Sequence, residues 1–99
     1  MQKIQAHDIK REELDGRGKY TWALDGLEAE LQYTVTSKDV RTADHAVVPP
    51  ALQGSGVGHA LVERMVNDAR NSGWRIKPVC GFVASAKEKH PDWHDAFVN

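Results

Sequence analysis

Three glycines at alternating positions, Gly54, Gly56 and Gly58, separate a strand-like segment from a helix-like one. The segment before them, residues 40–48, stops at a pair of prolines, and proline cannot continue a strand ladder. After the last glycine, apolar residues recur every three or four positions, which is the spacing of an amphipathic helix. This order of strand, glycine loop and helix predicts a sheet with a helix packed back against it.

The residues before the loop predict an antiparallel meander. Residues 20–24 are rich in strand formers, and Asp25-Gly26 is a pair favoured in two-residue hairpins. Residues 27–36 alternate apolar and polar side chains, the pattern of a half-buried strand. A second turn at residues 37–39 leads into the predicted strand at 40–48. Sequential strands joined by short turns pair as antiparallel neighbours.

The residues after the loop predict a crossover. The helical spacing begins at Val57, and Gly73 is suited to end the helix in a left-handed conformation. Residues 74–80 then read as a strand, and a right-handed crossover places it parallel to the strand before the loop. Two short helices are predicted at residues 83–89 and 91–98, the second with proline at its first position.

The predicted fold class is therefore α+β: a three-stranded antiparallel meander, the glycine loop, a crossover helix, a parallel strand and short C-terminal helices. Residues 7–17 are mostly charged, and we interpret them as a solvated strand or turn. The 99 residues suit one domain, assigned to residues 1–99.

Composition excludes several classes of function. The 13 basic and 14 acidic side chains give a net charge of -1, which argues against a nucleic-acid binder because such proteins cluster positive charge. Residues 1–8 hold no apolar run like that of a signal peptide, and no stretch is long enough for a membrane span. The single cysteine, Cys80, rules out an internal disulfide and fits a cytoplasmic protein. The cysteine and the five histidines show no metal-site spacing, so no metal is expected.

The glycine loop itself favours an anionic ligand. Backbone N–H groups in such a loop can approach a phosphate or diphosphate closely, and the helix that follows adds unpaired N–H groups and the positive end of its dipole. The alternative is that the glycines serve only a tight turn and close packing. A Walker loop is excluded because no Gly-Lys-Ser/Thr is present, and in a Rossmann motif the third glycine would come one residue later than Gly58.

Four motifs together resemble a known family. The segment Gln53–Gly58 is similar to the Gln/Arg-x-x-Gly-x-Gly/Ala loop of the GNAT N-acetyltransferase superfamily. The segments His45–Pro49, Pro78–Phe82 and Lys89–Pro91 are similar to the His-x-x-Val-Pro, Pro-x-Cys-x-Phe and Lys/Arg-His-Pro elements of its minimal members, in the same order. The resemblance covers about residues 18–98. It departs from the usual pattern at Ala46, where Thr is common, at Gly81, where Pro is common, and at Gln53, where Arg is common.

The resemblance implies an acyl-CoA-dependent N-acetyltransferase that takes acetyl-CoA as donor and uses no metal. It places the pantetheine arm on the backbone of Ala46, Val47 and Val48. It places the diphosphate on the loop that follows, formed by Gln53, Gly54, Ser55, Gly56, Val57, Gly58 and His59. The acceptor is an amine of a small molecule or a protein, whose identity the sequence does not give. The alternative function is a non-catalytic acyl-CoA-binding or protein-interaction module.

Two side chains are candidates for catalysis. Cys80 follows the predicted parallel strand, and it is either a nucleophile that takes the acetyl group or a small buried residue. His45 is either a general base, an orienting partner of the cysteine, or a structural histidine. The resemblance also makes the backbone N–H of Val47 or Val48 the donor to the oxyanion. His90 is expected to cap the last helix before Pro91.

Overall fold

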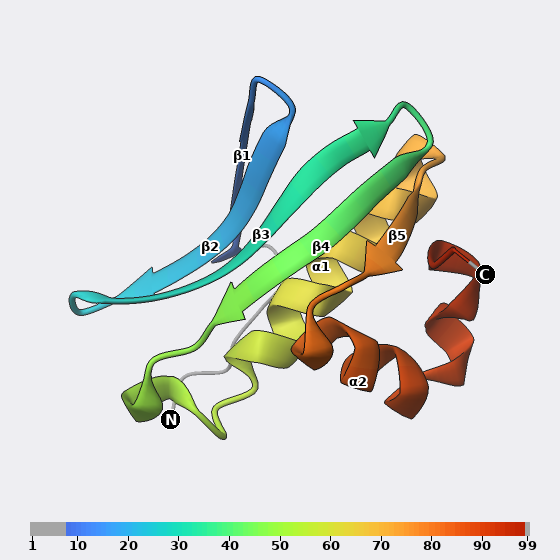
Figure 1. Ribbon diagram of the computed structural model, residues 1–99. Coiled ribbons are helices and arrows are strands. Elements are labelled where there is room, and N and C mark those ends of the chain that lie inside the picture. The colour runs from blue at the N-terminus through green and yellow to red at the C-terminus, as the bar shows by residue number, and fades with distance from the viewer. Residues whose placement is uncertain (1–7, 99) are drawn as a thin grey trace.

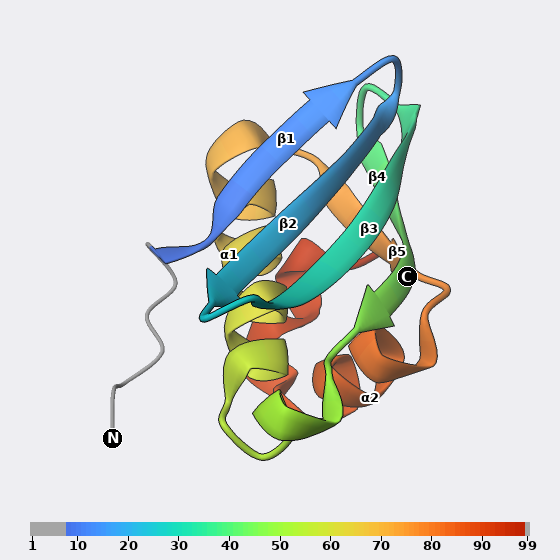
Figure 2. The ribbon, with the colours of Figure 1, turned by 90° about the vertical axis from the view of Figure 1, so that its left-hand side faces the viewer.

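A computed structural model describes residues 8–98, which form a five-stranded sheet with its helices on one face (Figures 1 and 2). The strands are β1 (Lys10–Leu14), β2 (Arg17–Leu24), β3 (Leu27–Ser37), β4 (Val40–Val47) and β5 (Arg75–Pro78). The α-helices are α1 (Val57–Ser72) and α2 (Gly81–Lys89), and short 3-10 helices lie at η2 (Pro50–Leu52) and η3 (Pro91–Ala96).

The strands lie in the sheet in sequence order, β1-β2-β3-β4-β5. The first four pair antiparallel, and β5 pairs parallel to β4 after the crossover through α1, as predicted. The meander has four strands and not the predicted three, because the charged segment at the start pairs with β2 along its full length. The turn between them, Asp15-Gly16, has positive φ at both residues, as Asp25-Gly26 has. The same turn chemistry therefore builds both hairpins.

The core lies between the sheet and α1. The inward-facing side chains of β2 and β3 are buried, and the alternation predicted for β3 is confirmed at Ala29, Leu31 and Tyr33. The facing side of α1 is buried at Leu61, Val62, Met65 and Val66, the stripe that its spacing predicts.

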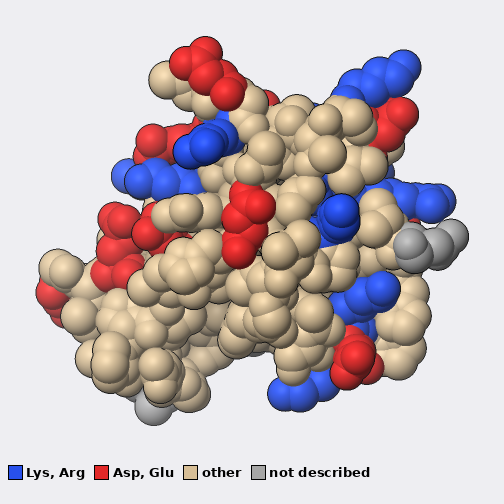
Figure 3. Space-filling view, in the orientation of Figure 1, with Lys and Arg blue, Asp and Glu red and all other residues tan. Residues whose placement is uncertain are grey.

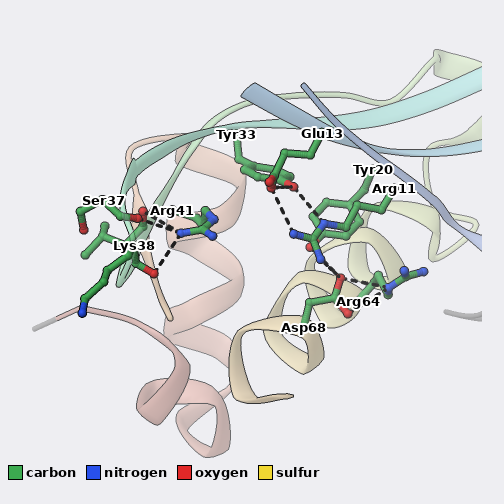
Figure 4. A network of polar contacts seen from close by, with 10 residues as sticks. Arg11, Glu13, Tyr20, Tyr33, Ser37, Lys38, Arg41, Arg64 and Asp68 are labelled. Carbon is green, nitrogen blue, oxygen red and sulfur yellow. Dashed lines mark hydrogen bonds and ion pairs between the residues drawn. The ribbon is translucent and has the colours of Figure 1, made fainter. Parts of the chain in front are cut away.

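A polar network joins β1 to α1 beneath the sheet (Figure 4). The Tyr33 hydroxyl accepts a bond from Arg11 Nε at 2.9 Å and donates to Glu13 at 2.6 Å. The Tyr20 hydroxyl donates to Asp68 of α1 at 2.8 Å, and Arg11 and Asp68 are 3.5 Å apart. The bond from Tyr33 lowers the pKa of Glu13, whereas burial raises the pKa of both tyrosines. β1 is thus held through paired polar groups, and its charged sequence lacks the apolar alternation by which a strand is usually predicted.

The chain end covers the outer edge of β5. Trp93, Ala96 and Phe97 are buried, and the Val98 N–H donates to the Ile76 carbonyl at 3.0 Å. The segment predicted as a helix at residues 91–98 is a 3-10 helix that ends at Ala96 and then becomes extended. Phe97, the first residue after this helix, forms a parallel bridge to Ile76.

β4 changes partners half-way along its length. It pairs with β5 only from Val40 to Ala43, where the Cys80 N–H donates to the Ala43 carbonyl at 2.9 Å. On the β3 side, the register passes from Ala43 to His45 and leaves Asp44 as the extra residue of a bulge. Within the described residues, no strand pairs with residues 44–47 on the side away from β3.

The polar network predicts a stability effect. Tyr33→Phe should lower the free energy of unfolding by about 1–2 kcal/mol, because it leaves Arg11 and Glu13 each without one partner. Thr36→Val is the matched control on the same strand. It removes an exposed hydroxyl bonded to Thr42 and should change stability by less than about 0.5 kcal/mol. Urea unfolding measures both; equal effects would show that the network adds nothing.

Candidate functional site

A cleft of about 860 Å³ opens where β4 runs on without β5. This volume lies in the usual range for small-molecule sites. One wall is the end of β4, a second is the glycine loop with the start of α1, and a ring from α2 completes it. The lining residues are His45, Ala46, Val47, Val48, Leu52, Gln53, Gly54, Gly56, Val57, Gly58, His59 and Phe82.

The loop leaves several of its backbone donors without an acceptor among the described residues. Gly54 and Gly56 have φ of 82° and 92°, a region that favours glycine, and Gly56 is the N-cap residue of α1. The Ser55 hydroxyl turns inward, where it donates to the Leu52 carbonyl and accepts from the Val57 N–H. No acceptor among residues 8–98 bonds the N–H of Gly54, Gly56, Gly58 or His59. These donors, together with the helix dipole, form the kind of site that binds phosphate.

Gly58 serves a different purpose from the other two glycines. A Cβ at this position would lie 2.5 Å from Cζ of the Phe82 ring and 3.0 Å from Cε2. The absence of a side chain lets the ring lie against the first turn of α1. Phe82 keeps 45% of its surface exposed, and it faces the cleft. Gly58 therefore shapes the cleft through close packing.

The cleft is poor in charge. None of its lining residues is Lys, Arg, Asp or Glu, so His45 and His59 are the only lining side chains that can become positive near neutral pH. Figure 3 agrees, because the part of the surface over η2 and the glycine loop carries neither blue nor red. An anion held here would depend on backbone dipoles and on these imidazoles.

The structure gathers nearly all of the residues predicted to bind cofactor. All of them line the cleft except Ser55, whose hydroxyl is used within the loop. Leu52 and Phe82 also line it and were not predicted. Phe82 belongs to the Pro78–Phe82 element, which points to the family but assigns no role to this ring. No sequence motif marks Leu52 as a lining residue.

The two predicted catalytic residues are not brought together. His45 lines the cleft from β4, on the exposed face of the strand. Cys80 is half-buried at the N-cap of α2, at the point where β4 and β5 part, but it is not a lining residue. No bond between the His45 ring and the Cys80 sulfur occurs in the described part of the chain.

His90 does not cap the last helix with its side chain. Its ring stacks on Trp93 instead, with centroids 3.9 Å apart and an interplanar angle of 16°. His90 is thus the N-cap residue of η3 by position, as expected, but its ring stacks on an indole and makes no capping hydrogen bond.

No cluster of three or more His, Cys, Asp or Glu side chains among residues 8–98 is arranged to hold a metal ion. None of the helices in that range is long and apolar enough to cross a membrane.

Comparison with known proteins assigns the family. The family model of the GCN5-related N-acetyl-transferases matches residues 19–96. The chain belongs to this family. A GCN5-like protein from Staphylococcus aureus, solved in solution by NMR, superposes with a TM-score of 0.71 at 25% identity, covering 93% of this chain and 90% of the other. A search of curated protein sequences gives no match. The family assignment confirms the resemblance and the fold, and acyl transfer is the class of reaction that it supports.

The contact between Gly58 and Phe82 predicts an energetic coupling. Gly58→Ala should destabilise the protein by about 1–2 kcal/mol, because the new Cβ displaces the ring. In a Phe82→Ala background the same change should be neutral or stabilising, since alanine favours a helix over glycine by about 1 kcal/mol. Gly81→Ala, at a position with nothing within 4 Å, is the control. Urea unfolding of the four-member cycle measures the coupling, and equal costs in both backgrounds would contradict it.

Proposed function

We propose that the protein transfers an acetyl group from acetyl-CoA to an amine, with the cleft beside β4 as the donor site. The proposal rests on two features that lie side by side. The unpaired end of β4 and the N–H groups of the glycine loop border one cleft of about 860 Å³, in a chain of the N-acetyltransferase family.

The cleft offers a separate place for each part of the donor. The pantetheine arm carries amide groups, and residues 44–47 of β4 present backbone N–H and C=O groups that no second strand uses. The arm is proposed to lie along Ala46, Val47 and Val48. The diphosphate is proposed to lie against the loop from Gln53 to His59, on the N–H groups of Gly54, Gly56, Gly58 and His59 that no described acceptor bonds.

The reaction itself needs little from side chains. The acceptor nitrogen forms a bond to the thioester carbonyl carbon, the carbon–sulfur bond breaks, and the amine proton ends on the CoA thiol or on a base. Holding both reactants in place can supply a large part of the rate. A backbone N–H of Val47 or Val48 is proposed to stabilise negative charge on the carbonyl oxygen. His45, which lines the cleft, is proposed as the base.

Direct transfer is favoured over transfer through Cys80. A nucleophilic thiol needs activation by a base or a positive charge. In the described structure, the thiol forms no bond to either His45 or His90. The half-buried side chain packs against the hydrophobic core instead. We therefore propose a structural role for Cys80.

The acceptor is proposed to be an exposed or large amine. β1 and β2 are joined by a two-residue turn, and the described helices lie on one face of the sheet (Figure 2). His45 is exposed and pairs with the exposed Gln32, which lies on the opposite face from the buried Leu31 and Tyr33. Nothing in that part of the chain encloses the acceptor side of the cleft. A protein amine fits this arrangement, and a small amine remains the alternative. The cytoplasmic location predicted from the sequence remains a prediction.

Donor binding is tested by thermal melting with CoA. Ligand at a hundred times its dissociation constant should stabilise the protein by about 2.7 kcal/mol, seen as a rise in Tm. Gln53→Glu should reduce this rise, because it adds a negative charge to the proposed diphosphate loop. Asn71→Asp adds the same charge on an exposed site near the other end of α1, and it should leave the rise unchanged. No rise for the unaltered protein at millimolar CoA would reject the proposed function.

The role of Cys80 is tested by intact-mass measurement after incubation with acetyl-CoA. We expect no added acetyl group on Cys80. We also expect Cys80→Ala to transfer acetyl groups to a lysine-containing peptide or to spermidine within about tenfold of the unaltered rate. Loss of an obligatory nucleophile costs several orders of magnitude. An acetylated Cys80 together with an inactive variant that still binds CoA would establish the two-step route.

A further inference from the structure

Three aromatic rings form a cluster beside the glycine loop. His59 projects from the first turn of α1, and its ring centroid is 4.9 Å from that of His90 and 5.3 Å from that of Trp93. His90 is stacked on Trp93, which is 5% exposed. His59 is a lining residue of the cleft, and His90 and Trp93 are not. The cluster therefore reaches the proposed diphosphate site through His59 alone.

The cleft offers a diphosphate no permanently charged side chain. A diphosphate diester carries two negative charges, yet the lining has no Lys or Arg, and the loop has Gln53 at the position where its family often has arginine. His59 is the only side chain of the loop that can become positive. Its own backbone N–H is one of the donors left free by the helix start.

We propose that His90 and Trp93 are positioning residues that hold the His59 imidazole at the diphosphate end of the cleft, where its protonated form supplies the missing positive charge. This inference rests on the proposed function. It gives the Lys89–Pro91 element a role in the donor site, because His90 of this element contacts the His59 ring. It also makes the affinity for the donor depend on pH.

Several charged or titratable groups surround His59. Glu63 lies one turn further along α1, His45 lines the cleft from β4, and His90 and Asp92 come from η3 and its N-cap. The Asp92 carboxylate lies 4.0 Å from His90 Nδ1. Lys87 of α2 lies over the Phe97 ring, at 5.7 Å. The substitutions below separate the contribution of His59 from those of the other histidines.

The sign of the pH dependence follows from linkage. Bound diphosphate favours the imidazolium, so binding is strongest at a pH where His59 is already protonated, and it weakens as pH rises and the proton must be taken up. Histidine side chains change charge between about pH 5 and 8. Dephospho-CoA is the appropriate probe, because it lacks the 3′-phosphate and its diphosphate keeps a constant charge over this range.

The experiment measures the dissociation constant of dephospho-CoA by calorimetry from about pH 5.5 to 8. The unaltered protein should bind about tenfold more tightly at the acidic end, which corresponds to about 1.4 kcal/mol. His59→Gln should bind weakly with no such slope, and His59→Lys should bind tightly across the whole range. His94→Gln, an exposed histidine in η3 whose ring faces the Lys87 carbonyl, is the control and should retain the slope.

Two substitutions at position 90 test positioning separately from charge. His90→Phe keeps a flat ring on Trp93 and should retain the affinity and the slope. His90→Gln removes the stack and should reduce both, while circular dichroism and urea unfolding confirm that the variant is folded. If the two variants behave alike, the positioning role is wrong.

The failures of the two proposals can be distinguished. If the unaltered protein binds neither CoA nor dephospho-CoA, the proposed function is wrong and the inference falls with it. If it binds dephospho-CoA and His59→Gln keeps the full slope, the donor site stands and the inference about His59 is overturned.

Discussion

The structure depends on the place where β4 loses one of its two partners. Over its first half β4 is an interior strand, bonded to β3 and β5, and over its second half it is an edge. Unpaired strand edges bind other backbones and aggregate unless they are covered or used. Here the edge faces the glycine loop across a cleft, so the backbone N–H and C=O groups that β5 does not pair are available to a ligand. The bulge at Asp44 and the parting from β5 begin at neighbouring residues, so both act on the same part of β4.

The loop and its surroundings divide the work between backbone and side chains. Gly54 and Gly56 adopt conformations that expose N–H groups, whereas Gly58 makes room for an aromatic ring. Behind the loop, the stacked rings of His90 and Trp93 support the first turn of α1 through His59. The charge-poor lining means that attraction for an anion depends on preorganised backbone dipoles and on the imidazole of His59.

Much of the fold could be read from periodicity and turn residues. Local patterns predicted three features that the structure confirms. They are the alternation in β3, the buried stripe on α1 and the end of α1 at Gly73. β1 could not be predicted in this way, because it is rich in charge, and Arg11 and Glu13 are held by hydrogen bonds to Tyr33, a partner distant in sequence. The stack of His90 on Trp93 and the place of Phe82 in the cleft also arise from tertiary contacts. Sequence spacing therefore located the donor loop, but it could not show that Cys80 and His45 form no bond to each other.

The bond from the Cys80 N–H to the Ala43 carbonyl marks the last point at which the two strands are fastened together. Whatever widens the angle between β4 and the start of α2 must stretch this bond first, and whatever fills the cleft without widening it leaves the bond intact. The exchange of this one amide proton with heavy water is thus a built-in gauge of how far the cleft opens.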